Sequence, residues 1–175
     1  MEKKWFTISV YSENNVGMLN RISGIFLKRH INIESLNVSK SEIEHVSKFT
    51  IVINTTEDWT RKIVAQIERQ IEVLKTFYHT DEETIYQESA LFKIASHLLF
   101  DEPQIQNIIS GSKSKIVTVS REYFVLAKTG RRHEIDEMHD QLEPYGIMQF
   151  VRSGRITVTK STMPITPIIN EFHQS

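Results

Sequence analysis

Residues 5–53 carry the pattern that decides the fold, and they read WFTISVYSENNVGMLNRISGIFLKRHINIESLNVSKSEIEHVSKFTIVI. The first segment, residues 5–11, alternates polar and apolar side chains, which predicts a half-buried strand. A helix is predicted from about Met18 to Arg29, because its apolar residues recur at helical spacing. Residues 31–40 and 46–53 have an extended pattern, and the second stretch is rich in β-branched residues. The segment therefore predicts strand, helix, strand, strand.

The residues that follow complete a known arrangement of elements. Thr55–Asp58 can cap a helix, and Ile63, Ile67 and Ile71 give that helix one apolar face. Residues 71–78 read as a strand. The resulting order is β-α-β-β-α-β, which is the ferredoxin-like plan.

The same order of elements repeats in the second half of the chain. The expected second set consists of strands at 89–96, 114–120, 122–128 and 147–152, a helix that opens at Asp101-Glu102-Pro103 and stops at Gly111, a helix at 131–143, and a last extended piece at 155–160. We therefore predict an α+β protein with two tandem ferredoxin-like (βαββαβ) domains. The predicted boundaries are 1–80 for the first domain, 81–88 for a linker, 89–160 for the second domain and 161–175 for a tail. The tail holds Pro164 and Pro167, which predicts a loose segment or a short addition.

Composition excludes several classes of function. The chain has 21 Lys+Arg against 22 Asp+Glu and no cysteine among its 175 residues. Without cysteine there are no disulfides, thiolate metal sites or cysteine nucleophiles. The balanced charge removes the main attraction for a nucleic acid. No long apolar run and no signal-peptide core are present. These features predict a cytoplasmic protein that binds neither nucleic acid nor a membrane.

The sequence holds no recognisable arrangement of catalytic or metal-binding residues. Of seven histidines, only His133 and His139 share a predicted helix, at a spacing unsuited to chelating one ion. There is no P-loop, dinucleotide-binding fingerprint, H-E-x-x-H or G-x-S-x-G motif. The acidic run at 81–83 is expected to be solvated charge. The sequence therefore predicts no catalytic residue and no metal site.

The turn between the first strand and the first helix carries more specific chemistry. Helix N-termini offer unpaired backbone N–H groups and a partial positive charge, which suit a small carboxylate. Gly17 permits a positive φ and lets a ligand approach the backbone, and Asn14 adds a neutral donor and acceptor. The alternative is that Asn14 or Asn15 simply caps the helix.

Four motifs together resemble one family. They are N-N-V-G-M-L-N-R at 14–21, N-I-E-S-L at 32–36, Q-I-E-R-Q-I-E-V-L at 66–74 and R-S-G at 152–154. At these distances they resemble the small, regulatory subunits of acetolactate synthase (acetohydroxyacid synthase), which begin with an ACT domain. The resemblance spans residues 5–160.

The resemblance implies regulation and not catalysis. The family's small subunit has no active site and no cofactor of its own. It binds and activates the large catalytic subunit, which carries thiamine diphosphate, Mg²⁺ and FAD. It confers feedback inhibition by a branched-chain amino acid, most commonly valine. The resemblance also implies a homodimer through ACT domains, with the effector between two chains. The effector-binding residues carried over are Asn14, Gly17, Met18 and Leu19 from one chain and Asn32 and Ile33 from the other.

Three positions depart from the family pattern. Met18 stands where a smaller residue is commoner, Val16 replaces Pro or Ser, and His30 replaces a Gly just after the first helix. We expect Met18 to alter the effector pocket, and we expect His30 to adopt the left-handed conformation. The second domain is expected, from the family alone, to dimerise or to contact the partner.

Other readings of the same topology remain as alternatives. One is an ACT-domain amino-acid sensor that regulates a different metabolic enzyme. An RNA-binding domain would need a basic-glycine lead before its aromatic strand, which residues 122–125 lack. A small hydrolase would need a phosphate-cradling loop with an aimed arginine, whereas Arg21 is expected to face solvent or a partner subunit.

Overall fold

The computed structural model describes residues 2–173, which divide into two compact units. The first unit comprises the chain up to Tyr86 together with the residues from Arg155 onward, and the second comprises Gln87–Gly154. The chain therefore leaves the first unit, forms the second, and returns to the first.

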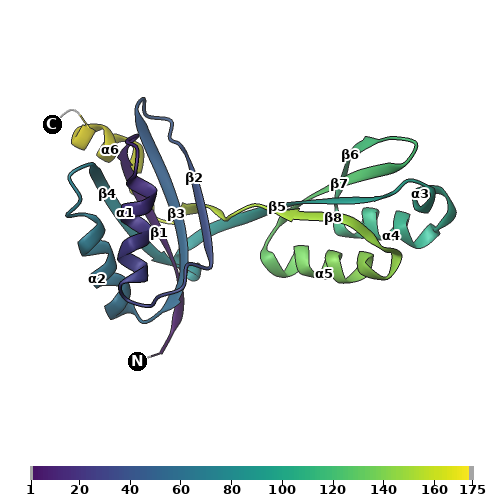
Figure 1. Ribbon diagram of the computed structural model, residues 1–175, viewed down its shortest axis with the longest axis horizontal. Coiled ribbons are helices and arrows are strands. Elements are labelled where there is room, and N and C mark those ends of the chain that lie inside the picture. Colours follow the sequence, from purple (N-terminus) through teal and green to yellow (C-terminus); the bar gives the residue numbers. More distant parts are fainter. Residues whose placement is uncertain (1, 174–175) are drawn as a thin grey trace. The chain divides into compact units, whose positions relative to one another are not determined.

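The first unit is built on a four-stranded antiparallel sheet in the order β2-β3-β1-β4 (Figure 1). Its elements are β1 (Lys4–Glu13), α1 (Met18–Leu27), β2 (Ser35–Lys40), β3 (Val46–Thr55), α2 (Glu57–Ile67) and β4 (Val73–Thr80). Thr56 caps α2 by accepting the N–H of Trp59 at 3.5 Å. Both helices bury their apolar stripes against one face of the sheet, where Phe6, Ile8 and Val10 of β1 point.

The opposite face of this sheet is covered by the returning chain. A short 3₁₀ turn (Asp81–Glu83) leads into β5 (Thr84–Ala95), and β9 (Ile156–Thr159) pairs with β5. The helix α6 (Ile165–His173) then places Ile169, which is fully buried, against Tyr11 and Val46.

The second unit repeats the topology of the first. Its elements are β5, α3 (His97–Asp101), α4 (Pro103–Ser112), β6 (Lys115–Val119), β7 (Tyr123–Gly130), α5 (Arg132–Leu142), a 3₁₀ turn (Glu143–Tyr145) and β8 (Ile147–Arg152). Its strand order is β6-β7-β5-β8, the counterpart of the first sheet. The core is centred on Phe92, Phe124 and Leu126 under α4 and α5. The predicted fold class, two βαββαβ units, is confirmed.

Several boundaries differ from the prediction. The helix expected to include Ile71 in its apolar face ends at Ile67, and Ile71 is 97% exposed. Gly111 does not stop its helix: α4 runs on to Ser112, and Lys113 takes the left-handed conformation instead, with φ 55°. The expected linker at 81–88 is ordered structure, because β5 begins at Thr84. Of the two expectations for the segment from Ser161, a short addition agrees with the structure: the segment contains α6, because Ile165 and Ile169 reach an apolar cluster.

Candidate functional site

The turn at residues 14–17 is held by backbone hydrogen bonds on both sides. The N–H of Glu13 donates to the carbonyl of Glu72 at 2.8 Å, and the N–H of Asn14 donates to the carbonyl of His45 at 2.9 Å. Gly17 follows with φ 88°, in the left-handed region that glycine adopts without strain. The turn is therefore a fixed structure that joins β1 to α1.

The N-terminus of α1 is free of a side-chain cap. Gly17 occupies the N-cap position, no side chain accepts a hydrogen bond there, and the first turn carries no acidic residue. Asn15 instead donates from Nδ2 to Oε2 of Glu13 at 3.3 Å. The side-chain capping alternative for Asn14 or Asn15 is therefore wrong. The N–H of Met18 donates to the carbonyl of Asn15 at 3.4 Å, so an anionic ligand would use the N–H groups that follow it in the first turn.

Arg21 fixes the start of α1 from the side. Its guanidinium forms a bidentate pair with Glu72, with N–O distances of 2.7 and 2.8 Å. The hydrogen bond from Arg21 holds the pKa of the Glu72 carboxyl below its ordinary value. Because Glu72 also accepts the N–H of Glu13, this one residue braces both ends of the turn. Arg21 is exposed, as expected, and the structure adds that it pairs with Glu72 of its own unit.

The second half of the predicted site lies at the other end of α1. His30 takes φ 52°, as expected of the residue that replaces glycine there. Asn32 and Ile33 follow as an extended connection, and β2 begins only at Ser35, later than predicted. The Asn32 amide is exposed and donates to Oε1 of Glu34 at 2.8 Å.

The structure does not bring the two halves together within one chain. The ten residues of α1 separate them by about 15 Å, given the rise of an α-helix. Asn14 and Leu19 are exposed near one end, and Asn32 and half-buried Ile33 near the other. Met18 differs from its neighbours, because its side chain is 2% exposed and belongs to the core. Its side chain therefore does not line a ligand pocket in the single chain.

Asn14 borders a small cavity. The cavity has a volume of about 240 Å³ and is completed by residues 40, 41 and 43–46 from the connection between β2 and β3. Gly17, Leu19, Asn32 and Ile33 do not line it. Of the predicted site residues, Asn14 is the one that borders this cavity.

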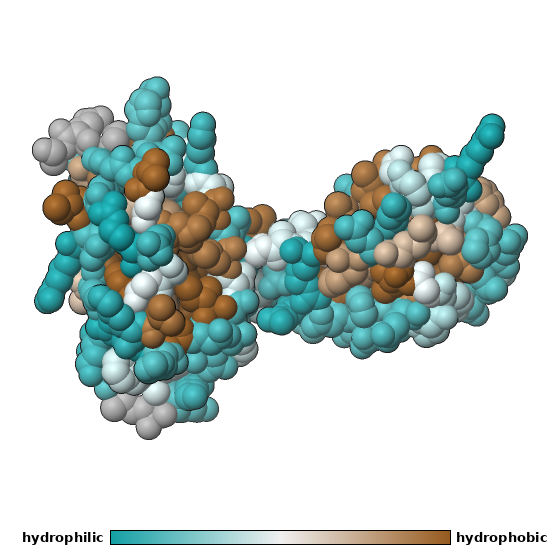
Figure 2. Space-filling model, viewed as in Figure 1, coloured by the Kyte–Doolittle hydropathy of each residue, from teal (hydrophilic) through white to brown (hydrophobic). Residues whose placement is uncertain are grey.

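An apolar surface extends along α1 and β2, and Figure 2 shows apolar side chains gathered between these elements. Leu19, Leu27 and Val38 are 47%, 74% and 44% exposed, and Ile31 and Ile33 are half-buried beside them. β2 is also an edge strand, paired only with β3 among the described strands. Edge strands and exposed apolar patches are features of association surfaces.

The other motifs have structural roles. The Ser35 hydroxyl of N-I-E-S-L accepts the N–H of Arg155 at 3.2 Å, which anchors the returning chain. In R-S-G, Arg152 pairs with Asp136 and, at 3.8 Å, with buried Glu88. Ser153 accepts the N–H of Ser89 at 2.9 Å. These motifs fasten the ends of β5, β8 and β2.

A larger cavity, which the sequence did not predict, lies on the face of the first sheet opposite α1 and α2. It has a volume of about 350 Å³, and Lys48 and Ser9 belong to it. The alternation of polar residues in β1 and β3 could have indicated a polar cavity on this face, but the same alternation is typical of a sheet face exposed to solvent. The residues that enclose this cavity, 157–166, lie far along the chain, partly in the last expected extended piece and partly in the expected tail.

Within residues 2–173, no group of three or more His, Asp or Glu residues is placed to hold a metal ion. In the same part of the chain, no helix is both long and apolar enough to cross a membrane.

Substituting Gly17 with alanine tests whether the turn requires a left-handed backbone at this position. A Cβ at Gly17 meets no atom within 4 Å, so the cost is the left-handed backbone, about 1–2 kcal/mol. Gly24, inside α1, also has open space around it, and Gly24→Ala should instead stabilise by about 0.5–1 kcal/mol. Urea titration measures both. Equal effects of the two substitutions would contradict the role given to the turn.

Comparisons with known proteins cover both units. A family model described as an AHAS small subunit-like ACT domain matches residues 8–75, and one described as the small subunit of acetolactate synthase matches residues 87–161. The chain is 35% identical over 161 residues to the acetolactate synthase small subunit of Bacillus subtilis (strain 168), covering 91% of this chain and 92% of that one. It is 30% identical over 155 residues to a probable acetolactate synthase small subunit of Archaeoglobus fulgidus, covering 88% and 96%. The crystal structure of the acetolactate synthase small subunit from Thermotoga maritima has the same fold, with a TM-score of 0.81, 23% identity and 91% and 99% coverage.

Proposed function

This chain belongs to the acetolactate synthase small-subunit family, and from that premise we propose that its first unit binds a branched-chain amino acid, valine foremost, between two copies of the chain. The family predicted from the sequence motifs is thereby confirmed. Its members are regulatory, non-catalytic subunits, and they imply a large catalytic subunit as partner. An ACT-domain sensor for a different enzyme is the weaker reading.

The proposal rests on the separation of the two halves of the predicted site, which lie at opposite ends of α1. In one chain the N-terminus of α1 near Asn14 and the exposed amide of Asn32 lie at opposite ends of α1, a helix about 15 Å long. A two-fold axis that sets two α1 helices side by side and antiparallel would bring the turn of one chain to Asn32 of the other. The apolar surface along α1 and the free edge of β2 supply the contact for such a pair.

The chemistry of each half suits one part of an amino-acid zwitterion. The N–H groups that follow Met18 at the start of α1 would take the carboxylate. The amide oxygens of Asn14 and Asn32 would accept from the ammonium. Leu19 and Ile33 would line the aliphatic side chain. Because Met18 is turned into the core, its length constrains this pocket less than the sequence suggested.

We place the cofactors of the reaction, thiamine diphosphate, Mg²⁺ and FAD, in the large subunit. This chain would act on that subunit by ordering its own dimer. An effector shifts such an equilibrium only through its different affinity for the two states.

Reconstitution tests the proposed function. The chain is mixed with the acetolactate synthase large subunit from the same source, and acetolactate formation is followed with and without valine, leucine or isoleucine. We expect the rate to rise and a branched-chain amino acid to reverse the rise. A rise in rate that none of the three amino acids reverses would contradict the proposal that a branched-chain amino acid is the effector. The absence of both a rise and a complex would contradict the partner.

A further inference from the structure

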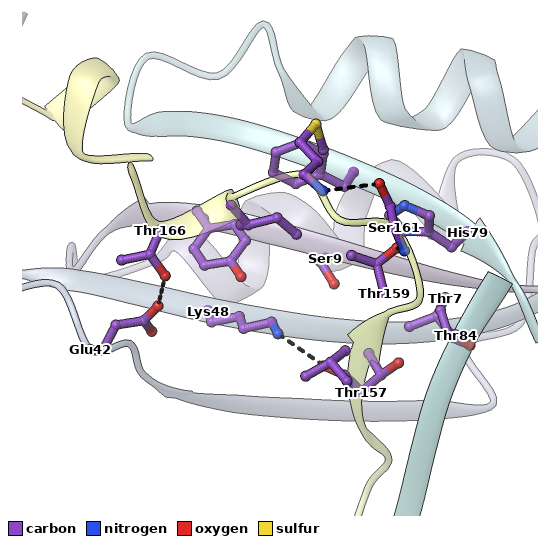
Figure 3. Close-up of a pocket in the computed structure, with 15 residues that line it drawn as sticks. Thr7, Ser9, Glu42, Lys48, His79, Thr84, Thr157, Thr159, Ser161 and Thr166 are labelled. Carbon is purple, nitrogen blue, oxygen red and sulfur yellow. Dashed lines mark hydrogen bonds between the residues drawn. The ribbon is translucent and has the colours of Figure 1, made fainter. Parts of the chain in front are cut away.

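The cavity opposite α1 has walls from several elements of the first unit. Its floor is the sheet, and the chain at 157–166 passes over it (Figure 3). The residues that line it are Thr7, Ser9, Tyr11, Glu42, Lys48, Phe77, His79, Thr84, Thr157, Val158, Thr159, Ser161, Met163, Ile165 and Thr166. A volume of about 350 Å³ lies within the range of small-molecule sites.

Lys48 supplies a cation without an acidic partner. Its Nζ donates to the carbonyl of Thr157 at 3.4 Å and lies 5.6 Å from the centre of the Tyr11 ring. Among the described residues, no carboxylate forms an ion pair with it. Burial lowers the pKa of Lys48, and the charge of Glu42 offsets part of that effect. A bound anion would relieve this desolvated ammonium.

Glu42 supplies an anion in the same cavity. Its carboxylate accepts a hydrogen bond from the Thr166 hydroxyl at the start of α6. That hydrogen bond, above all, lowers the pKa of Glu42, so the group is charged at neutral pH. Figure 3 shows Glu42 with Thr166 and Lys48 with Thr157, each as a separate pair. The two charges thus share one cavity without neutralising each other directly.

The remaining lining is mixed. Ser9 and Thr159 contribute hydroxyl groups, whereas Phe77, Met163 and Ile165 contribute apolar surface. A ligand here needs a carboxylate, a cationic group and a small, uncharged remainder.

We propose that this cavity binds a small zwitterionic α-amino acid, with its carboxylate on Lys48 and its ammonium on Glu42. The site lies on the face of the first sheet opposite α1, so it shares no residue with the effector site proposed above. It is complete within one chain. Its ligand would contact both the sheet and residues 157–166, and would therefore hold the returning segment and the start of α6 in place.

Isothermal titration calorimetry on the full chain tests the site. The Asn14→Ala background weakens the effector site, so that failure of one proposal does not imply failure of the other. The probes are L-threonine, L-valine and L-methionine, with acetate as a carboxylate that lacks the ammonium. We expect at least one of the three amino acids to bind and acetate to bind at least tenfold more weakly. No binding by any of the three, or equal binding of acetate, would overturn the proposal.

Substitutions then locate the binding. Lys48→Met and Glu42→Gln should each weaken binding by about tenfold or more, because each removes a charged hydrogen-bond partner. Lys62→Met is the matched control, since Lys62 also lies over an aromatic ring, 5.0 Å from the centre of Trp59, but outside the cavity. Lys48→Arg keeps the cation and separates a binding defect from a folding defect. Unchanged affinity in Lys48→Met, or equal losses in Lys48→Met and Lys62→Met, would contradict the assignment.

Hydrogen exchange gives an independent measurement. Saturation with the probe that binds should slow amide exchange in residues 157–166, which pass over the cavity. Slowing confined to residues 14–33 would place the ligand at the other site and overturn the proposal.

Discussion

Arg155→Met is expected to destabilise the first unit by about 2–3 kcal/mol. Arg155 is 6% exposed, and its guanidinium pairs with Asp81 at 2.6 Å, donates to the Thr7 hydroxyl at 3.1 Å and lies 3.7 Å from the centre of the Tyr86 ring. Removing one partner of a buried ion pair costs about 3–5 kcal/mol of stability. We expect a smaller cost here because the Asp81 side chain is 31% exposed to solvent. The substitution leaves a partly buried carboxylate without its cation.

The two tryptophans make this measurable. Trp5 and Trp59 are the only tryptophans in the chain, and both belong to the first unit, so their fluorescence in a urea titration reports on that unit alone. Arg61→Met is the control, because Arg61 pairs with Glu57 at 3.4 Å on an exposed helix face, where we expect a change below about 0.5 kcal/mol. A cost for Arg155→Met as small as the control's would show that the ion pair does not hold the returning chain.

Asn14→Ala and Asn32→Ala are each expected to weaken effector binding by about tenfold or more, while activation of the catalytic subunit persists. Each substitution removes an uncharged amide that would pair with a charged group of the ligand, and such bonds are among the stronger ones. Both residues are exposed in the single chain, so their loss should leave folding intact. Effector titrations of the reconstituted complex give both quantities.

Asn15→Ala is the matched control for these two. Asn15 neighbours Asn14 and is also exposed, but it is not one of the residues assigned to the effector site. We expect its effector response to match that of the unsubstituted chain. If Asn14→Ala lost both activation and effector binding, Asn14 would instead be needed for assembly with the catalytic subunit.

Local pattern predicted the first unit well because its strands and helices obey it. The alternation in β1 places Phe6, Ile8 and Val10 in the core, and Met18, Ile22, Ile25 and Phe26 form the buried stripe of α1. The positive φ of His30 was also predictable, because the family has glycine there. What local pattern could not supply was the second face of the sheet. Thr7 and Ser9 read as solvent-facing, yet they are 1% and 9% exposed, since residues from Arg155 onward cover them.

The sequence also could not predict the long-range ion pairs. The acidic run at 81–83 was interpreted as solvated charge, but Asp81 holds Arg155, 74 positions away, and Glu83 accepts the N–H of Thr80 at 2.7 Å. Arg21 is exposed as expected, but its partner Glu72, which is 51 positions away, was not predicted. Nothing in the spacing of such residues indicates which partner the topology will provide.

The candidate site was predictable in its parts but not in its arrangement. Gly17 and its positive φ follow from the turn, and the exposed amides follow from residue type. That Asn14 and Asn32 lie at opposite ends of α1, and that Met18 points into the core, emerges only when the helix is placed against its sheet.

Complementation between two defective chains tests most directly that the effector site is shared between copies. Asn14→Ala and Asn32→Ala chains are unfolded, mixed, refolded together and titrated with valine by calorimetry, beside each variant alone. In a two-fold dimer, a mixed pair holds one site with both substitutions and one intact site, so random mixing should restore about a quarter of the unsubstituted number of sites at full affinity. A mixture that binds no better than either variant alone would mean that both asparagines act within one chain, and would contradict the account.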